Sequence, residues 1–75
     1  MLTQEDYEFL KIFGPKEQLS EDKTYFLLRH DGKNIGVITM TKEQGTGFAE
    51  HMSNVGNKMS LTCREIPYDE LLRLT

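Results

Sequence analysis

An Asp-Gly pair between two strand-like runs is the feature that most constrains what this chain can fold into. Residues 25–30 and 33–40 are rich in aromatic and β-branched side chains, and Asp31 and Gly32 separate them. This spacing favours a two-residue hairpin turn, because both positions tolerate the positive φ angles that such a turn needs. The chain is therefore predicted to be built around a β-sheet.

The length of the turn sets which side chains of the hairpin face each other. A two-residue turn pairs Leu28 with Ile35 and Phe26 with Val37, whereas a three-residue turn would shift the pairing by one residue. The first register is preferred because it matches apolar with apolar side chains. The opposite face then carries Tyr25, Leu27, Ile38 and Met40. We expect both faces to be covered, and Gly36 inside the strand predicts a bulge or a close approach by another element.

A first helix is predicted to begin after Thr3, because Asp6 three residues later completes the spacing of a capping box. Gly14 and Pro15 end this helix, since neither residue continues a helix readily. Its apolar face, which we expect to lie in the core, consists of Tyr7, Phe9, Leu10, Ile12 and Phe13.

Three further elements follow the hairpin. A second helix is predicted over residues 47–55, with Thr46 as its N-cap and Gly56 after its end. Residues 58–64 alternate between polar and apolar side chains, as in a strand with one wet face. The inward positions of that strand are Met59, Leu61 and Cys63. Pro67 opens a last helix, whose first turn is acidic.

This order of elements predicts an α+β fold with the sequence α-β-β-α-β-α. The helix between the second and third strands lets the third strand return beside the first, which gives a three-stranded antiparallel sheet of order 2-1-3. The helices are expected to pack on the sheet. Seventy-five residues are enough for one domain, so residues 1–75 are predicted to form a single α+β domain.

Composition favours a soluble protein of the cytoplasm. Cys63 is the only cysteine, so no disulfide can form within the chain, as is usual in a reducing compartment. The N-terminus is acidic where a signal peptide would be basic, and no apolar run approaches the ~20 residues that cross a bilayer. We therefore expect no membrane association.

Charge is distributed unevenly along a chain whose net charge is −3. Residues 1–22 carry six acids against two lysines, whereas residues 23–42 carry four basic side chains against Asp31 alone. Such segregation is compatible with a partner surface. The hairpin tip is one candidate surface and comprises Arg29, His30, Asp31, Lys33 and Asn34. An acidic patch that would engage a basic partner comprises Glu5, Asp6, Glu8, Glu17, Glu21 and Asp22.

One short motif suggests a phosphate site. The run Gln44-Gly45-Thr46-Gly47 follows a predicted strand and precedes a helix, where free backbone N–H groups would bind an anion. Together with Phe48 and Ala49 its spacing resembles the pyrophosphate loop of the N-acetyltransferase superfamily, over about residues 24–55. The resemblance implies a site for coenzyme A. The chain is roughly half the length of such a fold, however, and a glycine-rich connection between strand and helix is the preferred explanation of the motif.

No catalytic or metal-binding group is predicted. Cys63 lies on the inward side of its strand, where a free cysteine behaves as a small apolar residue, and nothing in the sequence brings His30 or His51 to it. The spacing of these three residues is not that of a zinc site. Paired carboxylates at the helix starts are explained by capping and solvation. The chain is accordingly predicted to be non-enzymatic, with no cofactor and no metal.

Nucleic-acid binding is a less favoured alternative. The helix, three strands and closing helix resemble the element order of double-stranded-RNA-binding domains, with one helix inserted. That resemblance implies basic residues at the start of the last helix. Here Asp69 and Glu70 stand at that point and would repel phosphates.

The leading hypothesis is a small interaction module that binds another protein, such as a regulator or inhibitor encoded by a phage or mobile element. The absence of assembled catalytic groups and the small acidic chain motivate it. The hairpin tip and an open sheet edge are the two candidate surfaces, and a homodimer through a sheet edge would also enlarge a small core.

Overall fold

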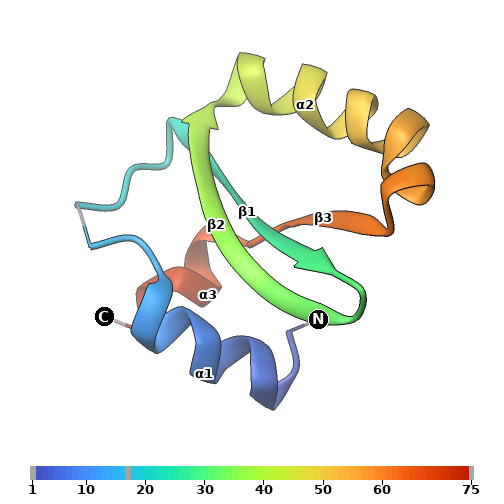
Figure 1. The fold of residues 1–75 in the computed structure, drawn as a ribbon. Coiled ribbons are helices and arrows are strands. Elements are labelled where there is room, and N and C mark those ends of the chain that lie inside the picture. The colour runs from blue at the N-terminus through green and yellow to red at the C-terminus, as the bar shows by residue number, and fades with distance from the viewer. Residues whose placement is uncertain (1, 17, 75) are drawn as a thin grey trace.

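The structure, a computed structural model, describes residues 2–16 and 18–74. Its elements are α1 (Gln4–Phe13), β1 (Lys23–His30), β2 (Lys33–Thr41), α2 (Lys42–Val55), the short 3-10 helix η1 (Gly56–Met59), β3 (Leu61–Glu65) and α3 (Tyr68–Arg73). The three strands form one antiparallel sheet in the order β2-β1-β3. The predicted α+β class, the order of elements and the strand order are confirmed (Figure 1).

The hairpin turns through Asp31 and Gly32, as predicted, with φ angles of 50° and 81°. His30 therefore pairs with Lys33, but the register shifts by one residue beyond Arg29. The shift is a β-bulge in β2, next to the glycine that predicted one.

The bulge makes the predicted side-chain pairs wrong. Leu28 lies opposite Gly36 and Phe26 opposite Ile38, rather than opposite Ile35 and Val37. Since neighbouring residues of a strand point to opposite faces, a shift of one residue exchanges the faces of the rest of β2. Val37 accordingly packs with the core on the face of Leu27.

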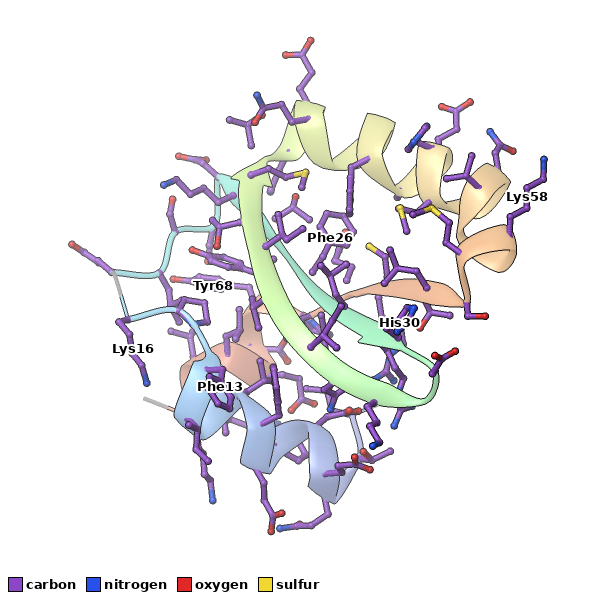
Figure 2. The ribbon with its side chains drawn as sticks, viewed as in Figure 1. Phe13, Lys16, Phe26, His30, Lys58 and Tyr68 are labelled. Carbon is purple, nitrogen blue, oxygen red and sulfur yellow. The ribbon has the colours of Figure 1, made fainter. Side chains whose placement is uncertain are left out.

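Helices cover both faces of the sheet, as expected. α1 and α3 lie on one face and α2 on the other (Figure 1). The main core lies on the first face and consists of Leu10, Tyr25, Leu27, Ile66 and Leu71. On the second face lies Phe26, which Figure 2 labels. Its ring meets that of Phe48 from α2 edge-on, with the ring centres 5.3 Å apart. Residues of β1 thus contribute to both layers.

α2 begins five residues earlier than predicted, directly after β2. Thr41, not Thr46, is its N-cap: the Thr41 hydroxyl accepts from the backbone N–H of Gln44, and the Gln44 side chain accepts from the N–H of Thr41. Gly45 lies where α2 crosses β1, and a Cβ atom added there would be 3.0 Å from the side chain of Thr24. A close approach between helix and strand therefore explains this glycine.

β3, in contrast, starts later than predicted. Residues 56–59 form η1, and Ser60 adopts a left-handed conformation with φ 53° before the strand begins at Leu61. The backbone N–H of Asp31 donates to the carbonyl of Ser60 at 3.1 Å, which holds this corner against the hairpin tip. Met59 was predicted to face inward, but it lies outside the strand and is 56% exposed.

The ends of the chain follow the sequence signals. The capping box of Thr3 and Asp6 is formed, and Gly14 follows the last residue of α1. α3 begins after Pro67, and the Tyr7 hydroxyl donates to Glu70, which joins α1 to α3. This hydrogen bond raises the pKa of Tyr7.

Two glycines of the α2–η1 segment should respond to alanine in opposite directions. A Cβ atom at Gly47 would meet no atom within 4 Å, so Gly47→Ala should raise the free energy of unfolding by about 0.5–1 kcal/mol through helix propensity. At Gly56 the added Cβ would lie 2.6 Å from the carbonyl oxygen of Leu61, so Gly56→Ala should destabilise by about 1–3 kcal/mol. Urea unfolding of both variants measures the difference, and equal effects would contradict this packing.

Candidate protein-interaction surface

Asp6, predicted to belong to an acidic partner-binding patch, lies instead in the interior. Its side chain is fully buried. The carboxylate accepts hydrogen bonds from the Thr3 backbone N–H at 2.9 Å, the Asn34 side-chain amide at 3.0 Å and the Arg64 guanidinium at 2.8 Å. These bonds tie the start of α1 to β2 and β3. Asp6 is therefore structural, and its assignment to partner binding is wrong. Asn34, which donates to it, is half-buried, and its predicted role in binding stays a prediction.

The Asp6 contacts also set its charge. Burial by itself disfavours a charged carboxylate, but the hydrogen bonds from Thr3, Arg64 and Asn34 outweigh it and hold the pKa of Asp6 well below its ordinary value. Asp6 is therefore ionised in the folded protein. A buried carboxylate with three donors is costly to disturb, because the donors lose their partner together.

The hairpin tip remains at the surface, where it meets the start of α1. His30, Asp31 and Lys33 are exposed. Arg29 is half-buried, and its guanidinium lies 3.7 Å from the carboxylate of Glu5. The tip and this part of the acidic patch, predicted as separate surfaces, are thus brought together and partly neutralise each other.

The rest of the acidic patch is scattered. Glu8 is exposed on α1, whereas Glu21 and Asp22 precede β1 and lie at the opposite end of the sheet from the tip. The eight residues of β1 separate the two ends by about 25 Å. Glu17 lies outside the described residues. The structure therefore does not gather the predicted acids into one patch.

The outer edge of β2 is a better-defined candidate surface than the hairpin tip or the scattered acidic residues. No other described strand pairs with it. The N–H of Ile66 donates to the carbonyl of Tyr25, so the backbone groups of Tyr25 point toward β3. Because alternate residues of a strand point to opposite edges, Phe26 and its partner Ile38 face each other across the β1–β2 pair.

It follows that the neighbours of Ile38 point their backbone groups outward. Val37 and Thr39 therefore present unpaired N–H and C=O groups on the open edge of β2. The equivalent N–H of Thr41 is already taken by the Gln44 side chain. The bulge and Lys33 limit the open stretch toward the hairpin tip.

α1 carries three apolar side chains that are not fully buried, and we call Phe9, Ile12 and Phe13 the α1 strip; Phe9 is half-buried and packs against the core. Ile12 and Phe13 are 64% and 61% exposed, and the rings of Phe9 and Phe13 lie 4.9 Å apart. The prediction that all three residues lie in the core is therefore wrong for Ile12 and Phe13. The sequence did contain a signal for this. The apolar residues of α1 cover a wider part of the helix surface than a single contact with the sheet can bury.

The direction of the α1 strip follows from helix geometry. Tyr7 contacts Glu70 of α3, and successive helical residues rotate by about 100°, so Phe9 lies about 160° around the helix from Tyr7. The strip thus faces away from α3. α1 itself lies against β2, the edge strand of the sheet. Figure 2 shows Phe13 on α1 below β2.

The predicted phosphate loop is not a loop in the structure. Gln44, Gly45, Thr46 and Gly47 all lie within α2. The N–H of Gln44 is bonded to Thr41, which removes one of the groups that would hold an anion. The prediction of phosphate binding depended on free backbone N–H groups in a loop, and these four residues do not form such a loop.

Cys63 and His30 share the α2 face of the sheet, which the sequence alone did not indicate. Cys63 lies opposite Leu28 and Leu61 opposite His30, so the two residues are diagonal neighbours, typically about 7–8 Å apart between Cα atoms. Burial raises the pKa of the Cys63 thiol. A thiol held in its neutral form is a poor nucleophile.

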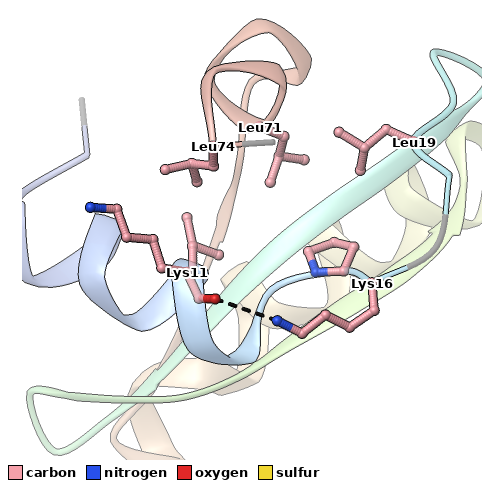
Figure 3. Close-up of a pocket in the computed structure, with 7 residues that line it drawn as sticks. Lys11, Lys16, Leu19, Leu71 and Leu74 are labelled. Carbon is pink, nitrogen blue, oxygen red and sulfur yellow. Dashed lines mark hydrogen bonds between the residues drawn. The ribbon is translucent and has the colours of Figure 1, made fainter.

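A cleft between the end of α1, the segment after it and α3 has a volume of about 260 Å³ (Figure 3). Its lining residues are Leu10, Lys11, Pro15, Lys16, Leu19, Leu71 and Leu74. The Lys16 ammonium donates to the carbonyl of Lys11 at 3.4 Å across its mouth. Cofactor and drug-sized sites usually occupy about 300–1,000 Å³. The volume of this cleft lies below that range, whereas two shallower hollows that border Lys42 at the start of α2 have volumes of about 360 and 410 Å³.

No cluster of His, Cys, Asp and Glu side chains within the described part is placed to hold a metal ion. None of the described helices is both long enough and apolar enough to span a membrane. Comparison with protein-family models, with curated proteins and with solved structures found no match.

The buried carboxylate predicts a specific pH dependence of stability. Asp6→Asn should lower the free energy of unfolding by about 2 kcal/mol at neutral pH, because three donors lose a charged acceptor. The folded-state pKa of Asp6 lies below its ordinary 3.8, so its contribution is present above pH 4 and is lost as the pH falls further.

The measurement is the urea unfolding of both proteins between neutral pH and about pH 2, where the difference between them should shrink. Asp22→Asn, at an exposed position, is the matched control and should change stability by less than about 0.5 kcal/mol. A difference that stays constant over this range would contradict the assigned charge of Asp6.

Proposed function

We propose that this chain is a small, non-enzymatic interaction module that binds a protein through the open edge of β2 and the adjoining α1 strip. The observation that carries the proposal is that α1, the helix with the exposed apolar side chains Ile12 and Phe13, lies against β2, the strand with the open edge. The edge supplies backbone hydrogen bonds, and the strip supplies apolar surface beside them. Both are what a partner strand with alternating side chains would use.

Exposure of the α1 strip supports this assignment. Ile12 and Phe13 lie adjacent along α1 and are both more than half exposed, in a chain with few residues to spare for its core. Exposed apolar groups that gather beside an open strand are typical of interaction sites, whereas isolated ones are normal on any surface. A regulator or inhibitor acting by binding is the role that such a surface would serve.

Two features argue against the alternative functions. A coenzyme A site would need a glycine-rich loop, but Gly45 and Gly47 lie in a helix whose N-cap is already occupied. Nucleic-acid binding would need a basic surface, but the first turn of α3 carries Asp69 and Glu70, and Arg29 lies beside Glu5.

Thr39→Pro is the variant that tests binding through the edge. Proline removes the outward N–H of Thr39 without removing a hydrogen bond to β1, and edge strands tolerate it. Tagged wild-type chain should retain a specific protein from its native cell, and Thr39→Pro should lose it. Thr39→Val keeps the N–H and should retain it. Equal retention by all three proteins, each shown to be folded by circular dichroism, would contradict the proposal.

Coenzyme A should leave the melting temperature unchanged at millimolar concentration. A ligand that binds only the folded state raises the melting temperature by mass action, and the occupied cap of α2 leaves no loop for its phosphates. Differential scanning fluorimetry with and without the ligand measures this. A concentration-dependent increase that Gly47→Ala abolishes would instead favour the phosphate-binding alternative.

A further inference from the structure

We propose that the cleft between the end of α1 and α3 binds a small aliphatic carboxylate, with its chain between leucine side chains and its charged end beside Lys16. None of the residues that line this cleft belongs to β2 or to the α1 strip. The site is therefore separate from the surface assigned to a protein partner, and the inference does not depend on the proposed function.

The cleft exists because the chain stops being helical at Gly14 and Pro15. The segment that follows forms no regular element before β1, and among its described residues Leu19 packs against the core. α3, on the other side, is only six residues long. A hollow of about 260 Å³ remains between this segment, the end of α1 and α3 (Figure 3).

The interior of the cleft is apolar. Leu10 and Leu71 belong to the main core and are nearly fully buried, whereas Leu19 and Leu74 are half-buried. Figure 3 shows Leu19, Leu71 and Leu74 around the same space. An aliphatic chain placed there would remove the remaining water from Leu19 and Leu74, which is the main source of affinity in pockets of this kind.

The charges at the cleft determine the head group of the ligand. Among the described residues that line it, Lys11 and Lys16 are the only charged ones. They are also the only basic residues in the first 22 of the chain, against six acids. Neither forms an ion pair within the described residues. Because a chain of net charge −3 repels anions in general, a preference for an anion at this cleft must come from these lysines.

Lys16 is the lysine placed to meet a carboxylate. Its ammonium donates to the carbonyl of Lys11 at 3.4 Å, and Figure 3 shows the Lys11 side chain extending away from Lys16. The last carbonyls of a helix carry partial negative charge, which would disfavour an anion. Here the N–H of Gly14 bonds the carbonyl of Leu10, and Lys16 covers that of Lys11. An ammonium has three N–H groups, so Lys16 retains two donors for the ligand.

The volume of the cleft limits the length of the aliphatic chain. An engineered apolar cavity of about 150 Å³ binds benzene, so about 260 Å³ holds roughly ten non-hydrogen atoms. Octanoate, which is of that size, is the probe, and a dissociation constant on the order of 1 mM is expected. Each added methylene should raise the affinity by up to about fourfold until the cleft is filled. The affinity should therefore rise from butanoate to octanoate and level off toward dodecanoate.

Methyl NMR of the isotope-labelled chain, titrated with octanoate, tests the position of the site. The methyl signals of Leu19, Leu71 and Leu74 should shift and saturate in the millimolar range. Those of Leu28 should not shift, because Leu28 points to the opposite face of the sheet from its core neighbour Leu27. An absence of shifts overturns the inference, and so do shifts confined to Ile12, which would place the ligand on the α1 strip.

Lys16→Glu separates the contribution of the charge from that of the aliphatic chain. It should weaken octanoate binding about fivefold, because an attraction at an exposed side chain becomes a repulsion. Binding of the neutral alcohol 1-octanol should change by less than about twofold. Lys58→Glu makes the same charge change on η1 and is the matched control, which should alter neither ligand. Circular dichroism checks that both variants are folded.

Three results of these titrations would overturn the inference. Octylammonium that binds the wild-type chain as tightly as octanoate would show that the cleft does not select an anion. An equal loss of octanoate and 1-octanol in Lys16→Glu would show that Lys16 acts on the cleft itself and not on the carboxylate. An affinity that rises by the same factor up to dodecanoate would contradict a site of limited size. Retention of a cellular protein by the open edge of β2 is a separate measurement, so failure here leaves the proposed function standing.

Discussion

The carboxylate of Asp6 is the contact on which the arrangement of the other elements depends. It is buried between a helix and a sheet, and it collects hydrogen bonds from Thr3, Asn34 and Arg64. These three residues belong to the start of α1, to β2 and to β3, so one side chain sets where the helix begins and which part of the sheet it lies beneath. The chain is small and buries little apolar surface, so this buried charge, rather than a large core, determines where α1 lies on the sheet.

The position of α1 in turn determines which of its apolar side chains are exposed. Because the helix is anchored beneath β2, an edge strand, its surface is covered by the sheet on one side and by α3 on another, and the remaining side stays open. Ile12 and Phe13 are exposed for this reason, although each belongs to an apolar face that a broader sheet would have covered. The open edge and the α1 strip are therefore two consequences of a sheet with only three strands.

Local signals predicted the elements of this fold well. The Asp-Gly turn, the capping box at Thr3 and the proline before α3 each act through a few neighbouring residues, and each is present as expected. The predicted start of α2 was wrong because two residues that can cap a helix lie close together in the sequence. Thr41 and Thr46 are both acceptable caps, and Thr41 prevails because Gln44 stands three residues after it and completes the capping box. Gly45 is accommodated in the helix because a strand passes close to it.

The sequence by itself determined the order of the elements, the antiparallel sheet and the hairpin turn, because these follow from backbone preferences and from the alternation of apolar residues. Only the tertiary structure decided which residues are available for binding. A single-residue bulge in β2 exchanged the faces of the strand, and burial moved Asp6 from the surface into the interior. The burial of Asp6 depends on contacts between segments distant in sequence, such as Asp6 with Arg64, which no local pattern encodes. Gly36 indicated a bulge, but not that the pairing of the rest of β2 would shift by one residue.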